Sequence, residues 1–445
     1  MLKGFKKALV CFSALFFTGC TELNFAVDGL INAPKLTSEQ SDIHQALIQS
    51  VGNNITLKYP KNGENRSAYV IANIDDELGD EALVFYQYNS NDSEDNGLRV
   101  NLLDKKDDGS WYSVKELAGA GTDIDQVIIS PMGDNNETDV LVGYQTMNND
   151  EKTLEIYSYD GHDFKRIGVD SYSLLSTLDI NSDNSNEIIT IQKTTNSDTG
   201  TVSASASLLS LQNGEIIKSS GIKMCDNVVS YISSEKGMID NSNMGLYIDG
   251  LNSDGNVQTE IIYYRNSKLQ NPIQSSKERL LPLCTRPSGY LCRDVDSDGV
   301  IEVPSVSPMM GYEKSLSDDK MYMTSWSSFQ RPRELEEKYK GYYSITDGYF
   351  LSFPNRWKNQ VTVKKDNNTG ELVFYKYTGS LESSTQEIMR IAASSKNESE
   401  EYLDDGYELI NSRGQLDYLV KLPSDKREQL ILTIDEVQNN FYIVD

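Results

Sequence analysis

The sequence predicts a mainly β protein that ends in a smaller α+β domain. Between about residues 55 and 330, short runs of β-forming residues alternate with clusters of Asp, Asn, Gly and Ser, which is typical of strands joined by turns. One acidic pattern recurs through this region. At residue 331 a charged stretch, RPRELEEKYK, begins a part of the chain with a different sequence pattern. A chain of 445 residues is long enough for one large repeat domain and one small domain.

The first 19 residues have the layout of a secretory signal, with three lysines followed by an apolar run that is too short to span a membrane as a mature helix. The run ends in Thr18-Gly19-Cys20, which resembles the lipobox of bacterial lipoproteins, although Phe17 stands where that family usually has Leu. The resemblance implies a signal peptide over residues 1–19 and an acylated, palmitate-type Cys20 on a tether over 20–37. It also implies anchoring in a cell membrane or envelope, facing outside the cytoplasm. An ordinary signal peptide or an N-terminal anchor is the alternative.

Residues 38–51, SEQSDIHQALIQSV, carry apolar side chains at helical spacing behind Ser38. This spacing predicts one amphipathic helix with Ser38 as its N-cap. Near the other end, the stretch ESEEYLDDG predicts a short helix that ends at Gly406, and Ser424 is expected to open a final helix. Strands and helices alternate in this last part, so we predict an α+β domain over residues 336–445.

The recurring pattern has Asp or Asn at its first position, oxygen-bearing side chains at the third and fifth positions, and Glu at the ninth. A search for repeats is decisive in a chain of this kind. A weaker fifth copy ends at Asp139. The four clear copies are Asn73, Asp75, Glu77 and Glu81; Asp179, Asn181, Asp183 and Glu187; Asn252, Asp254, Asn256 and Glu260; and Asp294, Asp296, Asp298 and Glu302.

These copies are not EF-hands, because position twelve is Val84, Thr190, Tyr263 or Ser305 and a strand follows it. They resemble instead the FG-GAP or VCBS repeats of integrin-type β-propellers, in which an Asp-rich loop joins two strands of a blade. The resemblance implies a β-propeller of six or seven blades, together with the N-terminal helix, over residues 38–335. A pair of β-sandwiches is the competing architecture.

In that family the loop oxygens hold structural Ca²⁺, so the resemblance implies calcium ligands at the four clear copies. The Asp294 copy has four carboxylates, which would repel one another without a cation. The alternative is that the loops persist as tight turns, in which Asp and Asn side chains bond to their own backbone.

Cys284 and Cys292 flank a Pro/Gly turn and could form a disulfide in an oxidising envelope, with two free buried thiols as the alternative. The acidic balance, with a net charge of −26, disfavours nucleic acid and anionic lipid as partners. The whole chain has two histidines, which disfavours a catalytic triad that uses a histidine as its base.

We therefore expect a lipid-anchored envelope protein that is not an enzyme, binding or organising a protein or a glycan. Two alternatives stay open. One is an envelope hydrolase or lyase that uses carboxylates on the propeller face. The other is an assembly factor whose C-terminal domain docks onto a partner.

Overall fold

In a computed structural model, the structure describes residues 36–444 except 76, 90–96, 133–136, 148–150, 213, 241–242, 317–319, 332–333 and 425–426. The predicted signal peptide and the acylated Cys20, with nearly all of the tether, lie outside the described residues. The chain is mainly β, and its strands form antiparallel sheets. Within the described part, no helix has both the length and the apolar character needed to cross a membrane.

The first element of the described part is helix α3 (Ser38–Val51), which confirms the predicted helix. Its N-cap is Thr37 rather than Ser38, because the Thr37 side chain accepts from the amide of Gln40 and the Gln40 side chain accepts in return. A five-stranded sheet follows. Its strands are β1 (Ile55–Leu57), β2 (Tyr69–Ala72), β3 (Glu81–Tyr88), β4 (Leu98–Lys105) and β5 (Trp111–Ala118).

In the next three sheets the first four strands pair in chain order, and two later strands depart from it: β14 pairs with β12, and β19 pairs with β17. The second contains β6 (Asp123–Met132), β7 (Glu137–Gln145), β8 (Lys152–Tyr159) and β9 (Phe164–Tyr172). The third contains β10 (Leu174–Leu178), β11 (Glu187–Thr195), β12 (Val202–Gln212), β13 (Glu215–Lys218) and β14 (Ile222–Lys223). The fourth contains β15 (Val228–Met238), β16 (Met244–Asn252), β17 (Asn256–Arg265), β18 (Lys268–Gln270) and β19 (Thr285–Pro287), with α4 (Pro272–Ser275), α5 (Lys277–Leu280) and η1 (Leu281–Cys284) before β19.

Two further sheets complete the described chain. The fifth contains β20 (Val303–Pro308), β21 (Tyr322–Arg331), β22 (Glu334–Ser344), β23 (Tyr349–Ser352) and the last strand, β29 (Phe441–Ile443). The sixth contains β24 (Val361–Lys365), β25 (Leu372–Lys376), β26 (Glu387–Ser395), β27 (Glu408–Arg413) and β28 (Leu416–Lys421). Short helices η3 (Asn355–Trp357), α6 (Ser399–Asp404) and α7 (Ile434–Asn439) lie between these strands.

Successive sheets pack face to face, and alternate residues of one strand contact different neighbours. In β7, Val140 and Val142 belong to the core shared with the first sheet, whereas Leu141 belongs to the core shared with the third. In β11, Ile188 faces the second sheet, while Ile189 faces the fourth. Side chains alternate between the faces of a strand, so a strand buried on both faces needs a continuous apolar run. This explains runs such as the one that begins β11.

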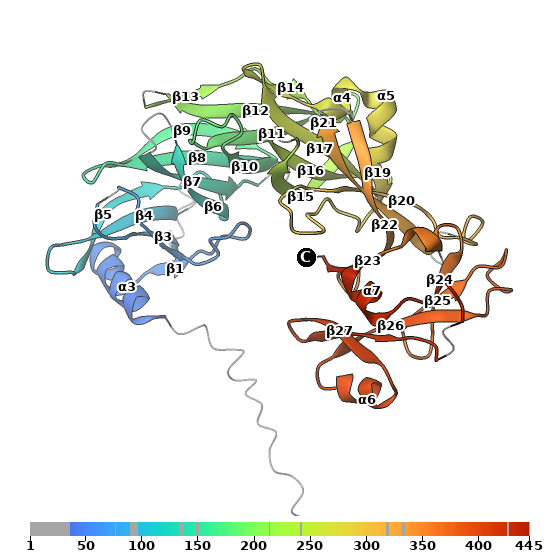
Figure 1. Ribbon diagram of the computed structural model, residues 1–445. Coiled ribbons are helices and arrows are strands. Elements are labelled where there is room, and N and C mark those ends of the chain that lie inside the picture. Colours follow the sequence, from blue (N-terminus) through green and yellow to red (C-terminus); the bar gives the residue numbers. More distant parts are fainter. Residues whose placement is uncertain are drawn as a thin grey trace, which may run out of the picture.

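The stack of sheets is covered at both ends. Ile43 and Leu47 of α3 pack against Ala82 and Val84 on the outer face of the first sheet. At the other end, the sixth sheet packs on the fifth in one core that includes Leu351. Figure 1 shows the sheets following one another as an arc, with α3 at one end and the C-terminal part at the other.

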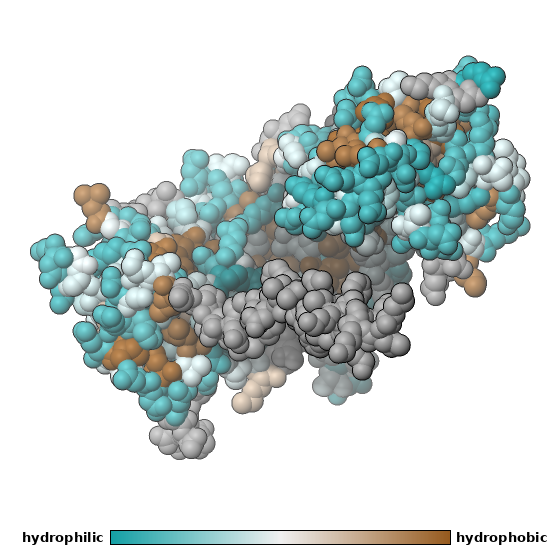
Figure 2. All heavy atoms as spheres, turned by 90° about the horizontal axis from the view of Figure 1, so that it is seen from below, coloured by the Kyte–Doolittle hydropathy of each residue, from teal (hydrophilic) through white to brown (hydrophobic). Residues whose placement is uncertain are grey.

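None of the described sheets closes on itself, and a ring of six or seven blades is not shown. The physical reason is that α3 and the sixth sheet already cover the two faces that a ring would bring together. Seen from below, the visible surface is mostly hydrophilic, with small separate hydrophobic patches (Figure 2).

Two predictions about the C-terminal part need correction. The expected domain boundary between residues 335 and 336 falls inside β22, which pairs with β21 and β23. The final helix begins after the capping residue Thr433 rather than at Ser424, because Thr433 and Glu436 form the capping box. The short helix α6, by contrast, confirms the prediction, and Gly406 adopts a left-handed φ of 84° just beyond it.

Candidate functional site

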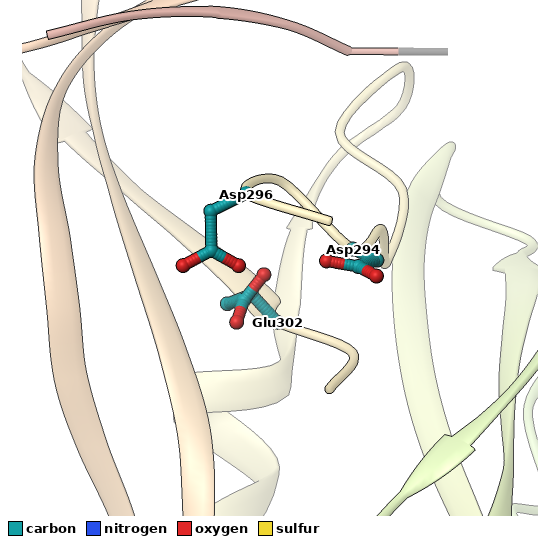
Figure 3. Close-up of side chains that lie close together, drawn as sticks. All are labelled: Asp294, Asp296 and Glu302. Carbon is teal, nitrogen blue, oxygen red and sulfur yellow. The ribbon is translucent and has the colours of Figure 1, made fainter. Parts of the chain in front are cut away.

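The Asp294 loop brings three carboxylates together immediately before β20. Ligand oxygens of Asp294, Asp296 and Glu302 all lie within 4.8 Å of one another. Figure 3 shows the Asp296 and Glu302 carboxylates turned toward each other, with Asp294 beside them. Three of the four residues predicted in this copy are therefore brought together, and the fourth, Asp298, lies in the same loop.

Backbone conformation shapes this loop. Ser297 and Gly299 have left-handed φ values of 61° and 84°, which reverse the chain twice within a few residues. The carboxylate of Asp294 accepts from the amide of Asp298 at 3.1 Å and from the amide of Gly299 at 2.8 Å. Both carboxylate oxygens of Asp294 thus accept hydrogen bonds from backbone amides of the same loop, as in an Asx turn.

The Asp179 loop, between β10 and β11, repeats this geometry. Its fourth and sixth residues, Ser182 and Asn184, have φ values of 64° and 71°. Asp179 accepts from the amides of Asp183 and Asn184 at 3.1 and 3.0 Å. The two loops are 115 residues apart in the chain, from 179 to 294, and have the same pattern of turns and hydrogen bonds.

The closing glutamates share one role in three loops. Glu81, Glu187 and Glu302 each accept a hydrogen bond from the amide of the second loop residue, over 2.6, 3.3 and 2.9 Å respectively. All three side chains are buried. Burial raises the pKa of each carboxyl to about 7, because an ionised carboxylate is poorly solvated there.

Nitrogen donors of the chain lie among the loop oxygens. In the Asp294 loop, the Lys338 ammonium is 2.8 Å from Asp296, 2.6 Å from Asp298 and 3.1 Å from Glu302. In the Asp179 loop, the Asn181 amide donates to Asp183 Oδ2 at 2.8 Å and to Glu187 Oε1 at 2.6 Å.

These two loops also connect neighbouring sheets. Asn186 forms an isolated parallel bridge with Met132, at the end of β6, and its amide donates to Ser130 at 2.9 Å. Val300 of the Asp294 loop forms the equivalent bridge with Met238, at the end of β15. Each loop therefore ties its own sheet to the preceding one, which gives it a structural role independent of any metal ion.

The other two predicted copies differ from these loops at their early positions. In the first, the Asn73 amide donates to the backbone carbonyl of Glu77, and Asp75 accepts from the amide of Glu77. Residue 76 lies outside the described part, and the Asn73 copy is not among the carboxylate groups found close enough to hold a metal in the described residues.

The Asn252 copy is placed differently and was wrongly interpreted as a loop of four ligands. Asn252 ends β16, and Asn256 and Glu260 lie on β17, so that only a tight turn containing Asp254 separates the strands. Glu260 is buried away from that turn and accepts from the Asn271 amide at 3.0 Å and the Gln274 amide at 2.9 Å. The matching spacing arises from a hairpin.

The predicted disulfide is absent. Cys284 and Cys292 are free and buried, as is Cys225. The Cys292 amide donates to Asp249 at 2.7 Å, and the same carboxylate pairs with the buried guanidinium of Arg286. The sequence alone did not reveal this Arg286–Asp249 pair, because residues 37 positions apart meet only through the pairing of β17 with both β16 and β19.

A polar groove is lined by β6, β10 and β15, which are the first strands of the second, third and fourth sheets, and by the loop before β2. We name it the inner groove. Its volume is about 460 Å³. Amides and hydroxyls dominate its polar lining, and Glu64 and Lys236 supply one charge of each sign. It is lined by Gly63, Glu64, Asn65, Gln126, Val127, Ile128, Ile129, Ser130, Leu175, Ser176, Thr177, Asn186, Ser234 and Lys236.

Two of the groove's amides are fixed by hydrogen bonds. Asn65 donates to the carbonyl of Val127 at 3.0 Å, and Asn186 donates to Ser130 at 2.9 Å. Sequence reasoning missed the groove because its lining comes from three strands and two loops that lie far apart in the chain.

Comparisons with known proteins give no family. No family model and no curated protein sequence matches the chain. Among solved structures, it is similar to the exotype rhamnogalacturonan lyase YesX, with a TM-score of 0.29 and 10% identity over 73% of this chain and 72% of that one. It is also similar to AofleA from Arthrobotrys oligospora, with a TM-score of 0.27 and 10% identity over 76% of this chain and 84% of that one. Likeness at this level carries no argument about the site.

Proposed function

We propose that this protein is a lipid-anchored binding or scaffold protein of the cell envelope, whose stacked sheets form a propeller-like array that recognises a glycan or a protein. The N-terminal signal pattern and Cys20 support the anchoring, which would hold the protein outside the cytoplasm. The inner groove supports binding, and it is the single observation that carries the proposal.

The groove fits an uncharged, hydroxyl-rich ligand best. Its volume of about 460 Å³ lies within the range of small-molecule sites. The chain has a net charge of −26, yet the described lining carries one acidic and one basic side chain. Amides and hydroxyls can both donate and accept, as the hydroxyls of a neutral sugar require. We therefore propose a neutral glycan, rather than a charged one, as the ligand of the inner groove.

Binding is favoured over catalysis at this position. Most glycoside hydrolases act through a pair of carboxylates, whereas the described lining of the inner groove offers one, Glu64. A hydrolase or lyase remains the alternative function. Turnover of a neutral glycan by the purified full-length chain would establish that alternative.

Calcium belongs to this proposal as a structural ion at the Asp179 loop. There the oxygens of Asp183 and Glu187 converge on one neutral amide, and Asp179, Asn181, Asp183 and Glu187 together offer the oxygen ligands that Ca²⁺ prefers. An ion held by these residues would link the loop to β11 and support the sheets without entering the groove.

A glycan-binding screen tests the proposed function. The full-length chain in detergent should bind a neutral oligosaccharide, and Ser234→Leu should weaken that binding at least tenfold by filling the groove. Ser203→Leu makes the same change on β12, where the side chain is exposed and outside the groove. It should bind as the unchanged chain does. Equal binding by both variants, or retention of acidic glycans alone, would contradict the proposal.

A further inference from the structure

We propose that Lys338 is the cation of the Asp294 loop, so that this loop is neutralised by the chain itself and needs no metal ion. The resemblance to calcium-binding repeats implies a calcium ion in this loop. The contacts of Lys338 indicate that its ammonium occupies that role instead. The inference concerns this loop alone and does not depend on the ligand of the inner groove.

The contacts of Lys338 resemble those of a bound cation. Its ammonium lies within 3.1 Å of carboxylate oxygens from the third, fifth and ninth loop positions, Asp296, Asp298 and Glu302. An ammonium has three donors, and each has an acceptor here. The Lys338 side chain is 25% exposed, whereas that of Glu302 is fully buried. The inner end of the site is therefore shielded from water.

Charge balance favours a cation at this position. Four carboxylates lie within nine residues of the chain, and burying carboxylates without a partner is costly. The hydroxyl of Tyr339 also donates to Asp296 at 2.6 Å. Two adjacent residues of β22 thus hold the loop.

The Asp179 loop provides an internal comparison. Its backbone turns match those of the Asp294 loop, and a nitrogen donor contacts the same two oxygens, Oδ2 of the fifth residue and Oε1 of the ninth. The donor is the neutral amide of Asn181 in one loop and the ammonium of Lys338 in the other. The two loops therefore differ in whether the chain supplies a positive charge.

Lys338 also links distant parts of the fifth sheet. The loop precedes β20, while Lys338 lies on β22, and β21 separates these two strands in the sheet. A metal ion bound by the loop alone would not make this connection. An ammonium carried by β22 fixes the loop to a strand two positions away.

The experiment exchanges the donor types of the two loops. Lys338→Gln gives the Asp294 loop an amide like that of Asn181, and Lys338→Arg keeps the charge. Lys340→Gln is the matched control, because Lys340 lies on the same strand and pairs with the exposed Glu337. The number of calcium ions bound per full-length chain is measured by calorimetric titration after purification in chelator. A variant that is unfolded in chelator is instead measured after refolding with calcium.

Relative to the unchanged chain, Lys338→Gln should bind one additional calcium ion and should lose it again when Asp296→Asn is added. Lys338→Arg and Lys340→Gln should bind no additional ion. The inference is overturned if Lys338→Gln gains no calcium site, or if Asp296→Asn removes a calcium ion from the chain that still carries Lys338. The Asp179 loop is unaltered in all of these variants, so any calcium that it binds contributes equally to each measurement. If the Asp179 loop binds no calcium, the unchanged chain shows this by itself, and the comparison at Lys338 still holds.

Discussion

Arg286 donates through Nη2 to Oδ1 of Asp249 at 2.8 Å, with both side chains excluded from water in the fourth sheet. The guanidinium also donates to Thr259 and to the carbonyls of Cys284 and Tyr290. Removing one partner of a buried ion pair leaves an uncompensated charge, which costs about 3–5 kcal/mol. Arg286→Met should therefore lower the free energy of unfolding by about that amount, as measured by urea denaturation.

The double variant Arg286→Met with Asp249→Leu should lose less stability than Arg286→Met alone, since no charge is then left without a partner. A double variant that is less stable than the single one would show that the hydrogen bonds, rather than the charges, dominate this network.

Helix α3 should behave as a cover for the first sheet. Leu47 is fully buried against that sheet, and truncating a buried leucine costs about 2–5 kcal/mol. Leu47→Ala should reduce stability in that range, measured by thermal and urea unfolding. Gln49→Ala, at an exposed position of the same helix, should leave stability nearly unchanged. Equal effects from both changes would argue against this role of α3.

Glu428 should make stability depend on pH. The ammonium of Lys376, 2.8 Å away, lowers the pKa of Glu428 below its ordinary value of 4.5. A lowered pKa in the folded state stabilises the fold above pH 4.5, and this contribution is lost as pH falls through the folded-state pKa. The stability difference between the unchanged chain and Glu428→Gln should therefore be constant near neutrality and shrink below pH 4.5. A difference that stays constant down to pH 3 would contradict this.

The lipid anchor has a direct test. Cys20→Ala should abolish incorporation of a labelled fatty acid and release the protein from the membrane fraction, because a signal peptide of this length does not provide a stable span. Cys225→Ala is the control, since that cysteine is buried in the fold. Acyl labelling that survives the loss of Cys20 would exclude this anchor.

Calcium at the Asp179 loop should raise the melting temperature. An ion that binds the folded chain stabilises it by mass action, so a chelator should lower the melting temperature and added Ca²⁺ should restore it. Asp183→Asn should remove most of this response, whereas Asp198→Asn, at an exposed turn of the same sheet, should keep it. An unchanged melting curve in chelator, with no calcium by elemental analysis, would reject the site.

The sequence predicted what depends on local pattern. The periodicity of residues 38–51 predicted α3, and alternate oxygen-bearing residues located the Asp179 and Asp294 loops. The same spacing misassigned the Asn252 copy, because a nine-residue pattern does not distinguish a loop from a hairpin whose last residues lie on a strand. Spacing alone also suggested a Cys284–Cys292 disulfide that the fold does not contain.

Features formed by distant residues could not be predicted in this way. Lys338 is 36 residues after Glu302 in the chain (338 minus 302), and only the pairing of β20, β21 and β22 brings it to the loop. Whether the sheets form a ring depends on what covers the first and last faces. The stretch that became α3 predicted a helix but not the surface that it would cover.

The covered ends of the stack make the molecule a one-dimensional array. Core clusters join each sheet to its neighbours along the chain, so stability is expected to be the sum of sheet and interface contributions, as in solenoid proteins. Unfolding should then begin at an end and advance sheet by sheet. A whole sheet could be gained or lost in evolution while both end covers were retained, so related chains could differ in length by multiples of one sheet.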